Sequence, residues 1–245
     1  KVSFMGMTGF KSKIFSAATL FVTAGVAFGL VAPKSAEATL MMRLTNGATT
    51  IDVTDDAVGD GAFFIPGLID FAGTVGAFTT VGSVGFTQSF SNPDSTQLTL
   101  NLNSAITDGT TTETLSILLT ETDLTLDEIG TAIASAGFTQ ANNTTMSVRA
   151  YIDDSNTEFG TGTQLFDLGP FAGTFNTDGF TTFGGIDPLF SLTLELVLTH
   201  QANGGTSTVF TTGAAQVNIL PEPATTAVLG LGLVAAGLLR RRRKA

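Results

Sequence analysis

The chain has 245 residues, a formal net charge of −10, a single histidine, and neither cysteine nor tryptophan. The lack of cysteine excludes disulfides, thiolate metal sites and thiol catalysis. Residues 39–219 contain nineteen acidic residues against two arginines, which gives −17, whereas residues 1–38 carry +3 and residues 220–245 carry +4. An acidic surface of this kind repels phosphates and has no basic groove, so a nucleic-acid partner is excluded.

Residues 1–38 have the organisation of a secretory signal peptide. After two lysines, the nineteen residues 14–32 contain no charge. Ala36 and Ala38 then match the small-x-small arrangement that signal peptidase requires, because its pocket admits only small side chains at those positions. We expect a signal helix, export, and cleavage after Ala38. Because the apolar run is longer than usual, an uncleaved signal anchor is the alternative.

Residues 39–219 are predicted to fold as an antiparallel β-sandwich. Segments 97–103, 146–153 and 190–200 alternate apolar and polar residues with the period of a half-buried strand. The residues expected to point inward are Leu98, Leu100, Leu102, Met146, Val148, Ala150, Ile152 and alternate residues from Phe190 to Leu198. One apolar and one polar face per strand is typical of two packed sheets, here of the jelly-roll or immunoglobulin-like kind. The twenty phenylalanines are assigned to the core.

One short helix is expected inside this domain. Thr125 and Glu128 form a capping box, and residues 126–135 (LDEIGTAIAS) can continue as a helix. We expect this helix to lie over one end of the sandwich.

The last 26 residues combine two prolines, an apolar run and a basic cluster. Pro221 and Pro223 cannot continue a helix or donate to a strand ladder, so the segment around them is expected to be extended. The sixteen uncharged residues 224–239 would form a transmembrane helix of about 24 Å, and arginine side chains can snorkel to complete the span. The five basic residues 240–244 then hold that end in the cytoplasm.

This arrangement resembles the PEP-CTERM sorting signal of Gram-negative bacteria. The motif is Pro221, Glu222 and Pro223, the span is 224–239, and the basic cluster is Arg240, Arg241, Arg242, Arg243 and Lys244. The resemblance implies an exosortase as partner, transient membrane association through the helix, and delivery to the envelope, outer surface or extracellular matrix of an exopolysaccharide-secreting organism. A sortase signal of the LPxTG kind is the nearest alternative, but Pro223 and Ala224 stand where Thr and Gly are required. A permanent single-span anchor is the other.

The sequence offers little for catalysis. His200 falls on the inward register at a strand end, and nothing local supplies a nucleophile elbow or an oxyanion loop. Asp153 and Asp154 are adjacent on a strand, so they point to opposite faces and are poorly placed to flank a glycosidic bond. We therefore predict a protein that is not an enzyme and that needs no cofactor.

Calcium is the metal that the acidic turns could hold. Asp154, Asn156 and Glu158 alternate and offer hard oxygen ligands at the spacing of a looped Ca²⁺ site. A second turn supplies four carboxylates: Asp52, Asp55, Asp56 and Asp60. Neither turn matches the EF-hand pattern, so solvated turns are the alternative interpretation.

Two functional classes fit these features. The first is a non-enzymatic surface or matrix protein associated with exopolysaccharide in a biofilm. The second is a carbohydrate-binding module or adhesin, stabilised by calcium if the acidic turns bind it. Sugar platforms usually need an exposed Trp or Tyr, and Tyr151, on an outward register, is the only such residue in the chain.

Overall fold

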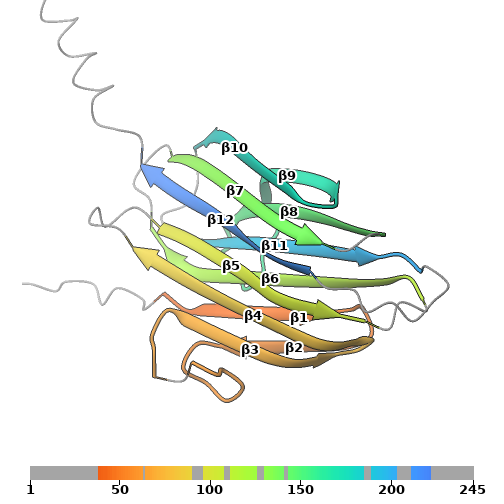
Figure 1. Ribbon diagram of the computed structural model, residues 1–245. Coiled ribbons are helices and arrows are strands. Elements are labelled where there is room, and N and C mark those ends of the chain that lie inside the picture. The colour runs from red at the N-terminus through yellow and green to blue at the C-terminus, as the bar shows by residue number, and fades with distance from the viewer. Residues whose placement is uncertain are drawn as a thin grey trace, which may run out of the picture. The chain divides into compact units, whose positions relative to one another are not determined.

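The structure is a computed structural model, which describes residues 38–62, 64–89, 96–107, 111–125, 130–140, 143–184, 189–202 and 211–221. The predicted signal helix, Ala36 and the sorting-signal residues beyond Pro221 lie outside these ranges. Within them the chain forms twelve β-strands and no helix (Figure 1). Consequently, none of the described segments is a helix that could cross a membrane.

The strands follow one another closely along the described chain. In order they are β1 (Leu40–Thr45), β2 (Thr50–Thr54), β3 (Leu68–Val75), β4 (Phe78–Ser89), β5 (Thr96–Ile106), β6 (Glu113–Leu124), β7 (Gly130–Gln140), β8 (Thr144–Asp153), β9 (Thr163–Ala172), β10 (Phe175–Phe183), β11 (Phe190–His200) and β12 (Thr211–Pro221).

These strands form two antiparallel sheets. Sheet A has the order β2-β1-β6-β11-β8-β9, and sheet B has the order β10-β7-β12-β5-β4-β3. Figure 1 looks onto the outer face of sheet B, with sheet A behind it. The apolar inner faces of the two sheets pack against each other and form one continuous core, so the predicted β-sandwich is confirmed.

From β5 onward the chain passes between the sheets in the pattern of a jelly roll. In sheet B the spatial order is β5-β12-β7-β10, and in sheet A it is β6-β11-β8-β9. Two four-stranded antiparallel sheets with these orders are two Greek keys wound into a jelly roll. The first four strands widen the sandwich, β1 and β2 beyond β6 and β3 and β4 beyond β5. Of the two predicted kinds of sandwich, the strand order therefore identifies the jelly roll rather than the immunoglobulin-like one.

The three predicted strands are β5, β8 and β11, and their inward residues are those expected. Each side chain predicted to point inward is at most 2% exposed: Leu98, Leu100, Leu102, Met146, Val148, Ala150, Ile152, Phe190, Leu192, Leu194, Leu196 and Leu198. Period-two alternation of large apolar residues was a reliable signal here because burying one face is what holds an antiparallel strand in place.

Two outward residues of β11 are nevertheless fully buried. Ser191 donates a hydrogen bond to the backbone oxygen of Thr157 (2.8 Å), and Thr193 shares a 2.9 Å hydrogen bond with Thr120 on β6. β11 is a central strand of sheet A, and Thr157 in the turn after β8 lies against the start of it. The outer side of this strand end is therefore covered by the chain itself.

The helix predicted over residues 126–135 is wrong. Residues 130–135 belong to β7, and residues 126–129 lie outside the described ranges. β7 alternates like the other strands, with inward residues at most 3% exposed: Ala132, Ala134, Ala136 and Phe138. Alanine favours helices by only about 0.7 kcal/mol per residue or less. Hydrogen bonding to β10 and β12 on both sides outweighs that preference.

Close approach of the two sheets requires a small residue at one inward position of β4. A Cβ atom added to Gly85 would lie 2.5 Å from Leu119 Cδ1 and 2.8 Å from Met42 Cε, both on sheet A. Glycine at this position allows the two larger side chains to fill the centre of the core.

Replacing Gly85 with valine is expected to lower the free energy of unfolding by about 1–3 kcal/mol, because the added methyl groups overpack the core. Urea denaturation measures this change. Gly137→Ala on the outer face is the matched control, since an added Cβ there meets nothing closer than 3.5 Å. Its effect should stay within about 0.5 kcal/mol. Equal losses in the two variants would contradict this account of the core.

Candidate functional site

The outer face of sheet A carries a network of charged side chains. Arg149 lies 3.2 Å from Asp167 and 3.6 Å from Glu195. Glu195 also accepts hydrogen bonds from Ser116 (2.9 Å) and Tyr151 (3.2 Å). Burial and the Glu195 carboxylate raise the pKa of Tyr151. Tyr151 does point outward as predicted, but it is part of this ion-pair network and only partly exposed.

Arg43, the other arginine among the described residues, is also paired on sheet A. Its guanidinium donates to both carboxylate oxygens of Asp52, at 2.7 and 2.8 Å. The same guanidinium lies 4.1 Å from the ring centre of Phe159, which belongs to the turn after β8. The hydrogen bond between the two side chains is the main cause that raises the pKa of Arg43 and lowers that of Asp52.

The outer face of sheet B has a different chemistry. Strands β4, β5, β7 and β12 contain no Asp, Glu, Lys, Arg or His, and the flanking strands β3 and β10 contribute one Asp each. The outward residues of the central strands are mostly amides, hydroxyls and small side chains. This face is therefore close to neutral, although the domain as a whole is strongly acidic.

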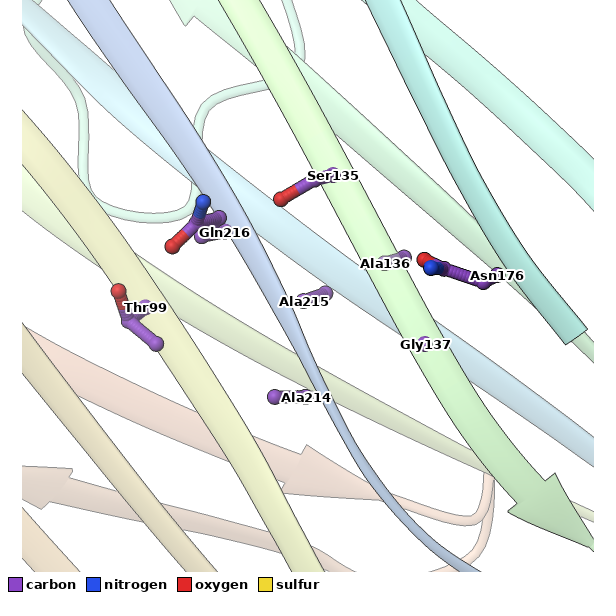
Figure 2. A pocket seen from close by; sticks show the side chains of 8 residues that line it. All are labelled: Thr99, Ser135, Ala136, Gly137, Asn176, Ala214, Ala215 and Gln216. Carbon is purple, nitrogen blue, oxygen red and sulfur yellow. The ribbon is translucent and has the colours of Figure 1, made fainter.

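A shallow pocket of about 260 Å³ lies on this neutral face (Figure 2). It extends across β5, β12, β7 and β10 and is lined by Thr99, Ser135, Ala136, Gly137, Asn176, Ala214, Ala215 and Gln216. We call it the sheet B pocket. Its polar groups are uncharged and can both donate and accept hydrogen bonds.

The strand register explains the hollow. Ala214 on β12 lies between Asn101 and Gly137, and Gly137 in turn lies opposite Asn176. Because Ala214 and Gly137 have little or no side chain, the surface is low along this row and higher at both edges.

The next row of the register supplies the polar groups of the pocket. Gln216 lies between Thr99 and Ser135. The Gln97 amide donates to Gln216 Oε1 (2.8 Å) and to Thr99 Oγ1 (3.1 Å), which holds both residues in position beside the hollow.

An exposed apolar pair lies next to the pocket. Phe180 on β10 and Ile133 on β7 are cross-strand partners, and they are 69% and 37% exposed. The adjacent cross-strand pair on the same face is Asp178, two residues from Phe180 along β10, and Ser135, two residues from Ile133 along β7. The assignment of all phenylalanines to the core is therefore wrong for Phe180, and also for Phe64, which is 82% exposed.

Asp55, Asp56 and Asp60 bring one carboxylate oxygen each within 4.8 Å of the others. Most of their oxygens are already used to shape the turn after β2. Asp55 Oδ2 accepts from the Gly67 amide (2.6 Å), and Asp56 Oδ1 from the Phe64 amide (2.8 Å). Asp60 accepts three backbone amides, those of Asp56, Ala62 and Asp70. Asp52, paired with Arg43, is not part of this acidic cluster.

The predicted calcium ligands of the other turn have different roles in the structure. Asn156 Oδ1 accepts from the Asp123 amide, and its Nδ2 donates to the Asp123 carboxylate, both at 2.8 Å. Asp154 and Glu158 are exposed. Asp153 accepts from Thr157, which is the main cause of its lowered pKa. Calcium binding by Asp154, Asn156 and Glu158 stays a prediction, but the Asn156 oxygen is already bonded.

A second pocket, of about 580 Å³, lies at the end of the sandwich where the described chain begins. It is lined by Ala38, Leu40, Asp55, Asp56, Pro66, Gly67 and Thr87. Thr87 donates from its hydroxyl to Glu121 Oε2 at 2.6 Å, which links sheet B to sheet A. Glu121 is 3% exposed, and burial raises its pKa to about 7 despite the opposing effect of the Thr87 hydrogen bond.

His200 occupies the inward position predicted for it, at the end of β11. It is fully buried, and its Nδ1 lies 3.4 Å from Thr144 Oγ1 on the neighbouring strand β8. This position explains the histidine as part of the end of the core.

The end of β12 meets the predicted sorting signal. Pro221 is the last residue of the strand and lies opposite Gly130, whereas Glu222, Pro223, the apolar run and the basic cluster lie outside the described residues. Residues 220–244 match the family of the PEP-CTERM protein-sorting motif. The chain carries a PEP-CTERM sorting signal. This signal implies an exported, cell-surface-directed protein that is processed by an exosortase.

The chain has no match among curated proteins. Among solved structures, it is similar to a chain from the structure of infectious bursal disease virus Gx strain, with 13% identity and a TM-score of 0.23. The match covers 76% of this chain and 51% of the viral one, so the chain spans about half the length of its match. At this TM-score the likeness carries no argument.

The sequence interpretation missed the residues of the sheet B pocket. Gln216, Ser135 and Gly137 have no distinctive motif, and they come together only through the pairing of β12 with β5 and β7. For Phe180 a signal did exist, since residues 175–183 alternate and put Asn176, Asp178, Phe180 and Thr182 on one side. Three of these four residues are polar, which marks the outer face.

Glu121→Gln is expected to raise the free energy of unfolding at about pH 8 and to change it little at about pH 4. The folded carboxyl keeps its proton up to pH about 7, whereas the unfolded carboxyl loses it near 4.5. Wild-type stability should therefore fall between these values, by about 3 kcal/mol in full, at about 1.4 kcal/mol per pH unit.

Urea denaturation at a series of pH values measures this dependence. Glu113→Gln, at the other end of β6, controls for the loss of one carboxylate. The same pH dependence in wild type and Glu121→Gln would contradict the assignment of the effect to Glu121.

Proposed function

We propose that this PEP-CTERM protein is a non-enzymatic component of the outer surface or extracellular matrix of a Gram-negative bacterium, associated with exopolysaccharide in the biofilm. The observation that carries the proposal is the sorting signal at residues 220–244, which begins where a complete jelly roll ends. An acidic, exported domain of this kind suits a hydrated matrix, because its charge keeps it soluble.

The bounds of the first and last described strands support processing by two enzymes. β1 begins at Leu40 and β12 ends at Pro221. Signal peptidase cleavage after Ala38 and exosortase cleavage beyond Pro221 would therefore leave all twelve described strands in the mature protein. Until exosortase acts, the 224–239 helix would span the membrane, with Arg240–Lys244 on the cytoplasmic side.

The processing proposal predicts the mass of the mature protein. Wild-type protein from the surface fraction of the native host should lack Ala245 and the basic cluster. Pro221→Ala/Pro223→Ala should instead accumulate at full length in the membrane, because alanines favour a helix that hides the peptide bond. Intact-mass spectrometry of both fractions tests this.

The control for this experiment is Thr225→Ala/Thr226→Ala, just beyond the motif, which should be processed normally. A wild-type surface form that still ends at Ala245 would contradict the proposal and leave a permanent anchor.

Cleavage after Ala38 would also create a new positive charge beside an acidic pocket. The Asp55 amide donates to Leu40 O (3.1 Å), and the Thr122 amide donates to Thr39 O (3.2 Å), so Thr39 and Leu40 are each held by a backbone hydrogen bond. Asp55 Oδ1 is buried without a hydrogen-bond partner in the described part of the chain. Burial is the main cause that raises the pKa of Asp55, and the negative charges of Asp56 and Asp60 raise it further. An α-ammonium on Thr39 would offset this accumulation of negative charge.

We therefore expect the mature protein with a free N-terminus to melt about 2–4 °C above the same protein with an acetylated N-terminus at about pH 6. An ammonium that gains a carboxylate partner has a raised pKa in the folded state. The stabilisation by the free ammonium is therefore complete below its pKa in the unfolded chain, about 8, and is lost at higher pH. Calorimetry measures it, and Asp55→Asn should abolish it. Equal melting temperatures at about pH 6 would contradict the expectation.

A carbohydrate-binding module or adhesin is the second candidate function. The specific observation in its favour is the sheet B pocket with its uncharged lining and the exposed Phe180 beside it. This candidate differs from the first in requiring a direct and saturable contact with a glycan.

A further inference from the structure

We propose that the outer face of sheet B binds a neutral polysaccharide, with sugar residues seated in the sheet B pocket and one ring stacked on Phe180. This inference rests on the proposed association with exopolysaccharide and names the ligand class and the residues that would contact it.

The distribution of charge points to a neutral ligand. The two arginines of the described residues are both on sheet A, where each is paired with a carboxylate. A polyanion would therefore meet no cation on sheet B and would be repelled by a domain of net charge −17. A polycation would be drawn to the acidic turns rather than to the four uncharged central strands. An uncharged polymer is the ligand whose electrostatics match this face.

The lining of the pocket matches the hydroxyl groups of sugars. Gln216 and Asn176 have amides that both donate and accept, and Ser135 adds a hydroxyl that does the same. Gln97 holds Gln216 through a 2.8 Å hydrogen bond, so this amide is oriented before a ligand arrives. Polar groups fixed in advance reduce the entropy cost of binding.

Phe180 supplies the apolar part of the site. Sugar rings have C–H faces that pack against aromatic rings, and the Phe180 side chain is 69% exposed with Ile133 as its cross-strand neighbour. Two residues along a strand correspond to about 7 Å. A ring stacked on Phe180 would therefore be adjacent to one seated over Ser135, whereas Asn176, four residues from Phe180 along β10, would meet a sugar further along the chain.

The shape of the pocket favours a chain over a free monosaccharide. Its volume of about 260 Å³ is below the range of about 300–1,000 Å³ for pockets that enclose a small ligand. The pocket is instead elongated across β5, β12, β7 and β10, and three spacings between strands amount to about 14 Å. A polymer can lie along this hollow and contact it at several successive residues.

Affinity electrophoresis of the mature protein from the native host tests the proposal. The gels contain a neutral β-glucan, dextran or galactomannan, with alginate as the anionic comparator. Wild type should be retarded by at least one neutral polysaccharide and not by alginate.

Two variants remove the two parts of the site. Gly137→Val/Ala214→Val fills the hollow, and it should weaken binding at least tenfold. The fold should tolerate it, since a Cβ at Gly137 meets no atom closer than 3.5 Å and valine favours strands. Phe180→Ala should also weaken binding, and Phe180→Tyr should restore it. Gln164→Val, exposed on β9 of sheet A, is the matched control and should bind like wild type.

Several results would overturn the proposal. These are no retardation by any of the neutral polysaccharides, retardation by alginate alone, or unchanged binding after the hollow is filled. Light scattering tests whether a second copy of the chain occupies this face instead. A wild-type dimer that Gly137→Val/Ala214→Val converts to a monomer would show that the face is a contact between copies of the chain.

The same samples separate this inference from the proposed function. A protein that is processed and surface-located but shows no retardation contradicts only the glycan site. A protein that is retarded but remains at full length in the membrane contradicts only the sorting proposal.

Discussion

The fold depends above all on the placement of β12 in the middle of sheet B. This last strand is hydrogen-bonded to β5 on one side and to β7 on the other, so sheet B is divided until residues 211–221 are in place. Its inward residues Ala215, Val217 and Ile219 are at most 1% exposed and complete the core. Because β5 and β7 are distant in sequence from β12, the sandwich closes through non-local pairing. Non-local contacts of this kind form slowly during folding.

The same strand also leads into the sorting signal. The PEP-CTERM match begins at residue 220, inside β12, and Pro221 is the last residue of that strand. A proline suits this position, because it has no N–H to donate and ends the ladder without leaving an unpaired donor. The segment that completes sheet B is thus the same segment that leads into the motif, with no linker between them.

The two outer faces of the sandwich are built in different ways. Sheet A is covered at one end by the turn after β8, whose residues contact three strands: Thr157 contacts Ser191 of β11, Asn156 contacts Asp123 of β6, and Phe159 contacts Arg43 of β1. Charged pairs span the rest of that face. Sheet B is uncharged along its four central strands and has its largest exposed aromatic residue at one edge. Because this strongly acidic domain keeps the outer face of sheet B neutral, its two faces suit partners of different charge.

The features that the sequence determined by itself depend on residue identity or on local spacing. The sorting signal, the division of charge and the inward faces of β5, β8 and β11 are of this kind, because large apolar residues at every second position leave one arrangement that buries them. β7 was missed because its inward residues are mainly alanines, whose helix preference conceals the alternation.

Only the tertiary structure decided which strands are neighbours. Alternation specifies the face of a strand that is buried, but it carries no information about the strand that pairs with it. Ala214 and Gly137 form the floor of one hollow only because β12 inserts beside β7, and Asn176 borders it because β10 is the next strand. The jelly-roll order, the sheet B pocket and the Glu121–Thr87 contact between the sheets all follow from pairings across long stretches of chain, which local periodicity does not encode.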